Sequence, residues 1–223
     1  MISNRKLARI GELSFMNAVR LHKDAIILYK KGSFASAYFL SVLAIEELGR
    51  VHMIEKALSW DGGLGEYEQQ FLRVLYDHSM KQGYFYSNSF FHSWFDGTAK
   101  HKAFIESISK GSLEKAKQES VYVGLPKNRK EVDTTGRLSN PFKVSEKKAS
   151  KQITIVSDEI LVLAFGHIYQ VHGIDNPMVT QHFTRQFFNQ IQKLWDLKSI
   201  KARKHFKKVV AKFIKEDKPL KIT

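Results

Sequence analysis

The sequence predicts an all-α protein organised around an antiparallel pair of long helices. Apolar residues recur at three- and four-residue steps over several long segments, which is the pattern of helices with one buried face. The break between the first two segments, at residues 30–33, is short and contains glycine, serine and lysine. We find no internal repeat and no pair of segments with the alternating pattern of strands. With 43% hydrophobic residues in 223, the chain can bury a core of ordinary size.

The first two helices are expected over residues 5–31 and 33–60. In the first, an apolar stripe follows helical spacing: Leu13, Met16, Ala18, Leu21, Ala25 and Leu28. The sequence Lys30-Lys31-Gly32 predicts its end, because cations suit a helix C-terminus and glycine suits the left-handed cap. Ser33 is then expected to cap the second helix. A turn this short between two long helices predicts an antiparallel hairpin.

The remaining chain divides into shorter helices, one long loop and a basic C-terminal part. We expect a third helix from about residue 66 to 83, which bends there or continues to about 95. One or two short helices over 99–119 follow, then a long loop over about 120–143 with an extended piece at 121–123, a helix over 145–172, and a last helical region over 176–215. This pattern indicates one helical domain over residues 1–175 and a helical extension over 176–223.

The net charge is concentrated at the C-terminus. From residue 193 onward, eleven lysines and arginines face three acidic residues, a net charge of +8 out of +14 for the whole chain. Apolar residues keep helical spacing there, so we expect a basic amphipathic helix that binds RNA phosphates. The side chains expected to do so are Lys201, Arg203, Lys204, Lys207 and Lys208. A solvated surface helix is the alternative.

Composition also bears on the compartment and on membrane association. The chain has no cysteine, which excludes disulfides and thiolate metal sites and fits a reducing compartment. We see no apolar signal core at the N-terminus and no stretch of about 18 apolar residues, so no membrane partner is expected. The sequence therefore predicts a cytoplasmic protein.

The most aromatic run of the chain lies over residues 84–95. Its rings are Tyr84, Phe85, Tyr86, Phe90, Phe91, Trp94 and Phe95. Aromatic side chains are usually the largest contributors to buried surface, which favours a core or a dimer face. A surface that stacks on bases is the alternative.

Three ionisable residues stand in the middle of the second helix, directly after its apolar first part: Glu46, Glu47 and Arg50. A buried carboxylate needs a partner. Arg50 lies four residues after Glu46 and three after Glu47, and either spacing allows an ion pair on one helix. The group is therefore an internal salt bridge, or it braces a functional site.

The third helix carries a second ionisable group. Arg73 and His78 are five residues apart, about 140° around an ideal helix, and no other arginine has a histidine five to seven positions downstream. Asp77 and Lys81 share the face of Arg73. An arginine fork binds a phosphodiester, and histidine transfers protons near neutral pH. This combination suits cleavage of RNA by attack of the 2′-hydroxyl on phosphorus.

These residues resemble those of a known family. Glu46-Glu47-Leu48-Gly49-Arg50, after a helix that starts Ser33-Phe34-Ala35-Ser36-Ala37, is similar to the Glu-Glu-Leu-Gly-Lys signature of AbiV-family abortive infection proteins of the HEPN superfamily. Asp77-His78 with Lys81, and the segment at 121–123, also match, and the resemblance spans residues 10 to 165. Arg73 and His78 fit the HEPN ribonuclease motif of arginine, four to six residues, then histidine.

The resemblance implies a HEPN-like antiparallel helical bundle that forms a homodimer. Two facing motifs would share a metal-independent site that cleaves rRNA, tRNA or mRNA, stopping translation in phage-infected cells, with a phage-encoded protein as activator. Arg73 would bind the phosphate and His78 would be the general acid and base. Glu46, Glu47, Arg50 and Asp77 would support them, and Lys81 would hold a flanking phosphate.

Two other functions are alternatives to the ribonuclease. Val74 follows Arg73, where active HEPN ribonucleases commonly have a polar residue, so a non-catalytic HEPN dimer that binds RNA or a protein partner is the alternative. A carboxylate-bridged metal site needs Glu-x-x-His pairs on two helices. Gly49 and Arg50 stand three residues after the two glutamates, so no metal and no cofactor is expected.

Overall fold

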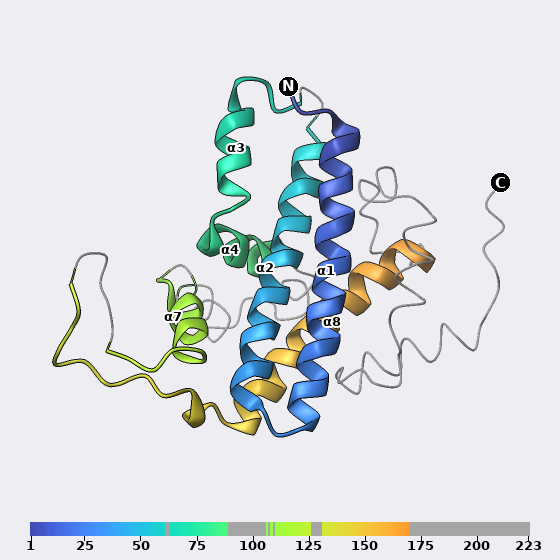
Figure 1. Ribbon diagram of the computed structural model, residues 1–223. Coiled ribbons are helices and arrows are strands. Elements are labelled where there is room, and N and C mark those ends of the chain that lie inside the picture. The colour runs from blue at the N-terminus through green and yellow to red at the C-terminus, as the bar shows by residue number, and fades with distance from the viewer. Residues whose placement is uncertain (61–62, 89–105, 107, 109, 126–130, 170–223) are drawn as a thin grey trace.

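The two long helices form the predicted antiparallel hairpin. The computed structural model describes residues 1–60, 63–88, 106, 108, 110–125 and 131–169. Helix α1 (Asn4–Lys30) and helix α2 (Phe34–Leu58) lie side by side along their length (Figure 1). Between them Gly32 adopts φ +79°, and the backbone N–H of Ser33 donates to the carbonyl of Leu28 at 2.9 Å. This is the glycine-dependent helix end that the sequence predicted.

Two details of the hairpin differ from the predictions. Ser33 occupies the N-cap position of α2, but its side chain makes no capping hydrogen bond. Leu13 is 49% exposed and does not belong to the buried stripe of α1, whereas Phe15 is buried. Leu13 lies about 200° around the helix from Phe15, so the two cannot face the same core. The buried face of α1 continues through Ala18 and Ala25 as expected.

Helix α2 is the central element of the bundle. It contacts α1 on one side, α8 (Glu146–Tyr169) on another, and α4 and α7 on a third. Helix α8 crosses the α1–α2 hairpin obliquely (Figure 1). It buries Ile153, Val156 and Ile160 completely, and these residues follow the helical spacing that predicted a helix over 145–172.

The third predicted helix is broken into two. After the short 3-10 turn Gly65–Tyr67, helix α3 spans Glu68–Val74 and helix α4 spans His78–Asn88. Asp77 begins the second helix as its cap, because its side chain accepts a hydrogen bond from the N–H of Met80 at 2.9 Å. The prediction of one continuous helix was therefore wrong. Figure 1 shows α3 running beside the hairpin and α4 turning across α2.

The rest of the described chain is helix α7 and an irregular arm. Helix α7 (Ser112–Glu119) precedes the predicted long loop, which ends in the 3-10 turn Pro141–Lys143. The segment at 121–123 is not a strand, and one antiparallel bridge joins Gly124 to Ser139. Across the described ranges, no helix combines the length and apolar character needed to cross a bilayer.

Several predictions lie outside the described residues. They are the second half of the aromatic run, the boundary at 175 and the basic helix with Lys201, Arg203, Lys204, Lys207 and Lys208. In the first half of the aromatic run, Phe85 and Tyr86 are 0% and 3% exposed, so these two rings are core residues.

Candidate functional site

A buried carboxylate, Glu46, is the centre of the polar site. Glu46 lies in the middle of α2 and is 3% exposed, with fully buried Ile45 beside it in the sequence. An ionised carboxylate in this position requires hydrogen bonds and opposite charges. The crossing of α4 and the packing of α7 supply both.

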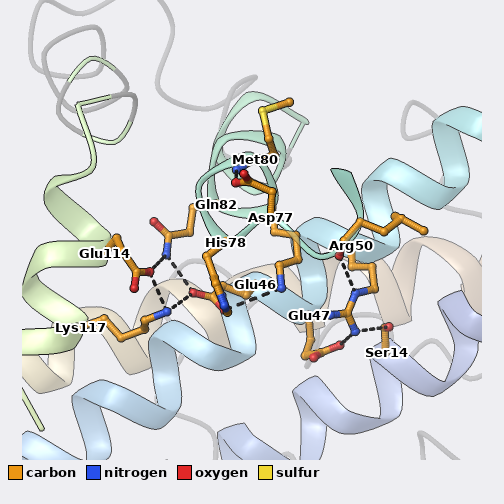
Figure 2. Close-up of polar contacts among 12 residues, drawn as sticks. Ser14, Glu46, Glu47, Arg50, Asp77, His78, Met80, Gln82, Glu114 and Lys117 are labelled. Carbon is orange, nitrogen blue, oxygen red and sulfur yellow. Dashed lines mark hydrogen bonds and ion pairs between the residues drawn. The ribbon is translucent and has the colours of Figure 1, made fainter. Parts of the chain in front are cut away.

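Each oxygen of Glu46 has its own partners (Figure 2). Oε1 accepts hydrogen bonds from Lys117 Nζ at 2.8 Å and from Gln82 Nε2 at 2.9 Å. Oε2 lies 2.6 Å from His78 Nδ1 and 4.0 Å from Lys81 Nζ. We call these five residues, Glu46, His78, Lys81, Gln82 and Lys117, together with Glu114, the Glu46 cluster.

Gly49 allows α4 to reach this carboxylate. A Cβ atom on Gly49 would lie 1.9 Å from the carbonyl oxygen of Lys81 and 2.7 Å from its carbonyl carbon. No side chain fits there, so α4 packs backbone-to-backbone against α2. This close crossing brings His78, at the start of α4, over Glu46, which lies one turn before Gly49.

The break between α3 and α4 sets the direction of His78. Asp77 caps α4, and the carbonyl of Leu75 accepts a hydrogen bond from Arg50 Nε at 3.3 Å. Leu75 itself is buried at 3% exposure, which fixes the turn against the bundle. His78 is consequently the first residue of a new helix, with its side chain 55% exposed.

Next to the cluster, Arg50 connects α2 to α1 and to the turn between α3 and α4. Its Nη1 donates to Glu47 Oε2 at 2.8 Å and to Ser14 Oγ of α1 at 3.4 Å. Its guanidinium also lies 6.0 Å from the ring centre of Tyr76. The ion pair anticipated within the Glu46–Arg50 segment therefore joins Glu47 to Arg50, and Glu46 turns toward α4 and α7.

Arg73 lies apart from the Glu46 cluster. It is an exposed residue in the last turn of α3, and its guanidinium forms no hydrogen bond or ion pair with any residue that the structure describes. The break at 75–77 places it on a different helix from His78, so the helix face that Arg73 was expected to share with Asp77 and Lys81 does not exist. Its guanidinium is available to an external anion.

The two lysines of the cluster are buried and respond differently to their surroundings. Burial, reinforced by the charge of Arg50, lowers the pKa of Lys81. Burial also acts to lower the pKa of Lys117, but hydrogen bonds to Glu114 and Glu46 outweigh it and raise that pKa. Lys81 is 3% exposed, so its position suits charge balance with Glu46 better than the contact with a flanking phosphate that we expected.

Glu114 closes the cluster on the α7 side. Its Oε2 lies 2.6 Å from Lys117 Nζ and accepts from Gln82 Nε2 at 3.1 Å. Burial acts to raise the pKa of Glu114, but the hydrogen bonds from Gln118 and Lys117 prevail and lower it. Ligand atoms of Glu46, His78 and Glu114 all lie within 4.8 Å of one another, so these three side chains also form a candidate cation site.

Sequence reasoning missed Gln82, Glu114 and Lys117. The signal for Glu114 and Lys117 was their spacing of three residues on one amphipathic helix, with Leu113 as the buried neighbour. That spacing alone does not distinguish Lys117 among 36 lysines and arginines, because such pairs of opposite charge also occur on exposed helix surfaces. The demand of Glu46 for a buried cation was visible, but the identity of that cation was not.

The fold and the site define the class of protein. The chain is an all-α bundle of the HEPN type in which a buried glutamate holds an exposed histidine near a capped helix start. The family model described as AbiV (HEPN_AbiV) matches residues 6–162, and the chain therefore belongs to the AbiV family. This membership points to a role in abortive infection, that is, in phage defence. No curated protein and no solved structure matches the sequence.

Proposed function

We propose that the protein is a metal-independent endoribonuclease that acts as a homodimer in phage defence. The observation that carries the proposal is the 2.6 Å contact between His78 Nδ1 and the buried Glu46 carboxylate. A buried acceptor that fixes Nδ1 leaves Nε2 of a half-exposed imidazole for a ligand, which is how a carboxylate prepares histidine for proton transfer.

Arg73 supplies the phosphate contact. Its exposed guanidinium has no partner within the described chain and lies a few residues before His78. Arginine binds phosphate oxygens in two places and stabilises the charge of a phosphorane. Because Arg73 and His78 sit on separate helices, a second copy of the chain facing the first would let the two motifs share one phosphodiester.

The proposed reaction is an internal transesterification. One His78 removes the proton of the ribose 2′-hydroxyl, whose oxygen attacks the adjacent phosphorus. The bond from phosphorus to the 5′-oxygen breaks, and the leaving oxygen takes a proton from His78 of the second copy. The products are a 2′,3′-cyclic phosphate and a free 5′-hydroxyl. The reaction needs one neutral His78 to accept a proton and one protonated His78 to donate one, and a dimer supplies the two copies.

The test is cleavage of total RNA by the purified protein, with and without EDTA. We expect cleavage that persists in EDTA and leaves 2′,3′-cyclic ends. His78→Ala and Arg73→Ala should each abolish cleavage while keeping the melting temperature. Arg20→Ala is the matched control, because Arg20 is an exposed arginine that pairs with Asp24 on the outside of α1. Full cleavage by His78→Ala contradicts the proposal.

A non-catalytic HEPN dimer is the second candidate function. It is favoured by Val74 at the position after Arg73 and by the separation of Arg73 from His78 on two helices. In this case the dimer blocks RNA or a protein partner by occupying it. The same RNA incubation separates the two functions, because binding in a gel-shift assay without cleavage supports occupancy. Size-exclusion chromatography tests the dimer that both functions share.

A further inference from the structure

The Glu46 cluster has the ligands of a metal site but contains an ammonium group. Glu46, His78 and Glu114 come from α2, α4 and α7, and their ligand atoms lie within 4.8 Å of one another. Two carboxylates and an imidazole are a usual donor set for divalent transition metals. Lys117 Nζ lies 2.8 Å from Glu46 Oε1 and 2.6 Å from Glu114 Oε2.

We propose that the Lys117 ammonium is a built-in cation, which takes the place of a divalent metal between Glu46 and Glu114 and thereby orients His78. Lys117 is a positioning residue, since it reaches His78 only through Glu46. Its consequence for RNA cleavage rests on the proposed function, but its effect on Glu46 and His78 does not.

The geometry explains how Lys117 acts on His78. Lys117 and Gln82 both donate to Oε1 of Glu46, so this oxygen is held on the α7 side. The other oxygen, Oε2, must then face α4, where it meets His78 Nδ1. Without the Lys117 cation, Gln82 is the described donor left at Oε1, so the carboxylate is held less firmly and the preference for one ring nitrogen of His78 weakens.

Burial and charge support a permanently charged Lys117. The residue is 3% exposed and has two carboxylates within hydrogen-bonding distance. These contacts raise the pKa of Lys117 in spite of its burial. Lys81, the other lysine of the cluster, lies 4.0 Å from Glu46 and farther from it than Lys117 does, so it is the weaker compensating charge.

The first test asks whether a metal can replace the ammonium. Lys117→Met removes the charge and keeps most of the volume. Isothermal titration with Zn²⁺ should show one site per chain, bound at least about tenfold more tightly than any site in the wild type. Lys115→Met is the matched control, because Lys115 is exposed on the same helix, and it should titrate like the wild type. Equal Zn²⁺ binding by all three proteins overturns the proposal.

A double variant distinguishes loss of Zn²⁺ binding from loss of folding. Glu46→Gln with Lys117→Met removes both charges of the pair, so it should fold and bind Zn²⁺ no better than the wild type. If Lys117→Met alone folds only with Zn²⁺, the replacement is demonstrated directly. If it stays unfolded with Zn²⁺ while the double variant folds, a metal cannot stand in for Lys117 and the proposal fails.

The second test reads the orientation of His78. Nitrogen-15 chemical shifts of the imidazole should identify Nδ1 as the protonated ring nitrogen of the neutral wild-type residue. In metal-free Lys117→Met we expect a mixture of both tautomers, whereas Lys115→Met should keep the wild-type pattern. An unchanged pattern in Lys117→Met overturns the positioning role. Neither test uses RNA, so both can succeed in a protein that does not cleave RNA.

Discussion

Gly49 of α2 lies directly against the backbone of Lys81 of α4, so closely that a methyl group on Gly49 would fall 1.9 Å from the Lys81 carbonyl oxygen. Helical glycine is ordinarily a cost to stability. Here the missing side chain is what lets α4 cross α2 and places His78 on Glu46. The glycine of the Glu46–Arg50 segment thus has a packing role that links the segment to the Arg73–His78 segment.

Gly49→Ala should destabilise the protein and displace α4. The obstructing atoms belong to the backbone, so the neighbour cannot rotate away, and we expect a loss of about 1–3 kcal/mol in the free energy of unfolding. Denaturant unfolding measures it. Gly83→Ala is the control, because a Cβ at this helical glycine meets nothing within 4 Å. The free energy of unfolding of that variant should rise by about 0.5–1 kcal/mol. Equal effects of the two substitutions would show that α4 does not cross at Gly49.

Glu46→Ala should be among the most destabilising single substitutions in the chain. It leaves Lys117 and His78 without their shared carboxylate, and removing one partner of a buried pair costs about 3–5 kcal/mol. Glu66→Ala removes an exposed carboxylate and should change stability by less than about 0.5 kcal/mol. Chemical denaturation of both variants is the measurement, and a loss below about 1 kcal/mol for Glu46→Ala argues against a charged Glu46 in the core.

The sequence predicted those features that depend on neighbouring residues. The hairpin of α1 and α2 follows from Gly32 and the apolar spacing, and the buried stripe of α8 follows from spacing alone. The need of Glu46 for partners was also evident, because the surrounding helix is apolar.

The sequence did not predict what depends on distant residues. From the sequence, Asp77 looks like an interior helix residue. In the structure, Arg50 of α2 donates a hydrogen bond to the carbonyl of Leu75, the helix breaks there, and Asp77 caps the next helix. Lys117 is 71 residues from Glu46, and its role appears only when α7 packs on α2. Helical periodicity does not predict either contact, since each depends on tertiary packing.

His52 should make stability depend on pH in the alkaline range. This buried histidine joins α2 to α8, with Nε2 2.9 Å from Glu159 Oε1 and Nδ1 3.3 Å from Glu55 Oε2. Burial acts to lower the pKa of His52, but the hydrogen bonds to Glu159 and Glu55 raise it from 6.5 to about 10. A raised folded-state pKa contributes stability that is complete below pH 6.5 and disappears as pH rises through 10.

The measurement compares the wild type with His52→Gln across this range. The variant should be less stable by about 3 kcal/mol near pH 6, and the difference should shrink steadily toward pH 10. Lys56→Gln is the control, because Lys56 is an exposed residue in the last turn of the same helix. A stability difference that is independent of pH would show that His52 is neutral in the folded protein.

His22 should act in the opposite direction and at lower pH. Its side chain is 0% exposed in α1, and neither ring nitrogen has a hydrogen-bond partner among the described residues. Burial lowers the pKa of His22 from 6.5 to about 4. The unfolded chain therefore binds one more proton than the folded chain between these values, and stability falls as pH drops from 6.5 to 4. His22→Leu removes both unpaired nitrogens and should raise stability by about 1–3 kcal/mol near pH 5. Stability curves at pH 4 to 8 test this, and an unchanged acid slope in His22→Leu would assign the acid sensitivity to other groups.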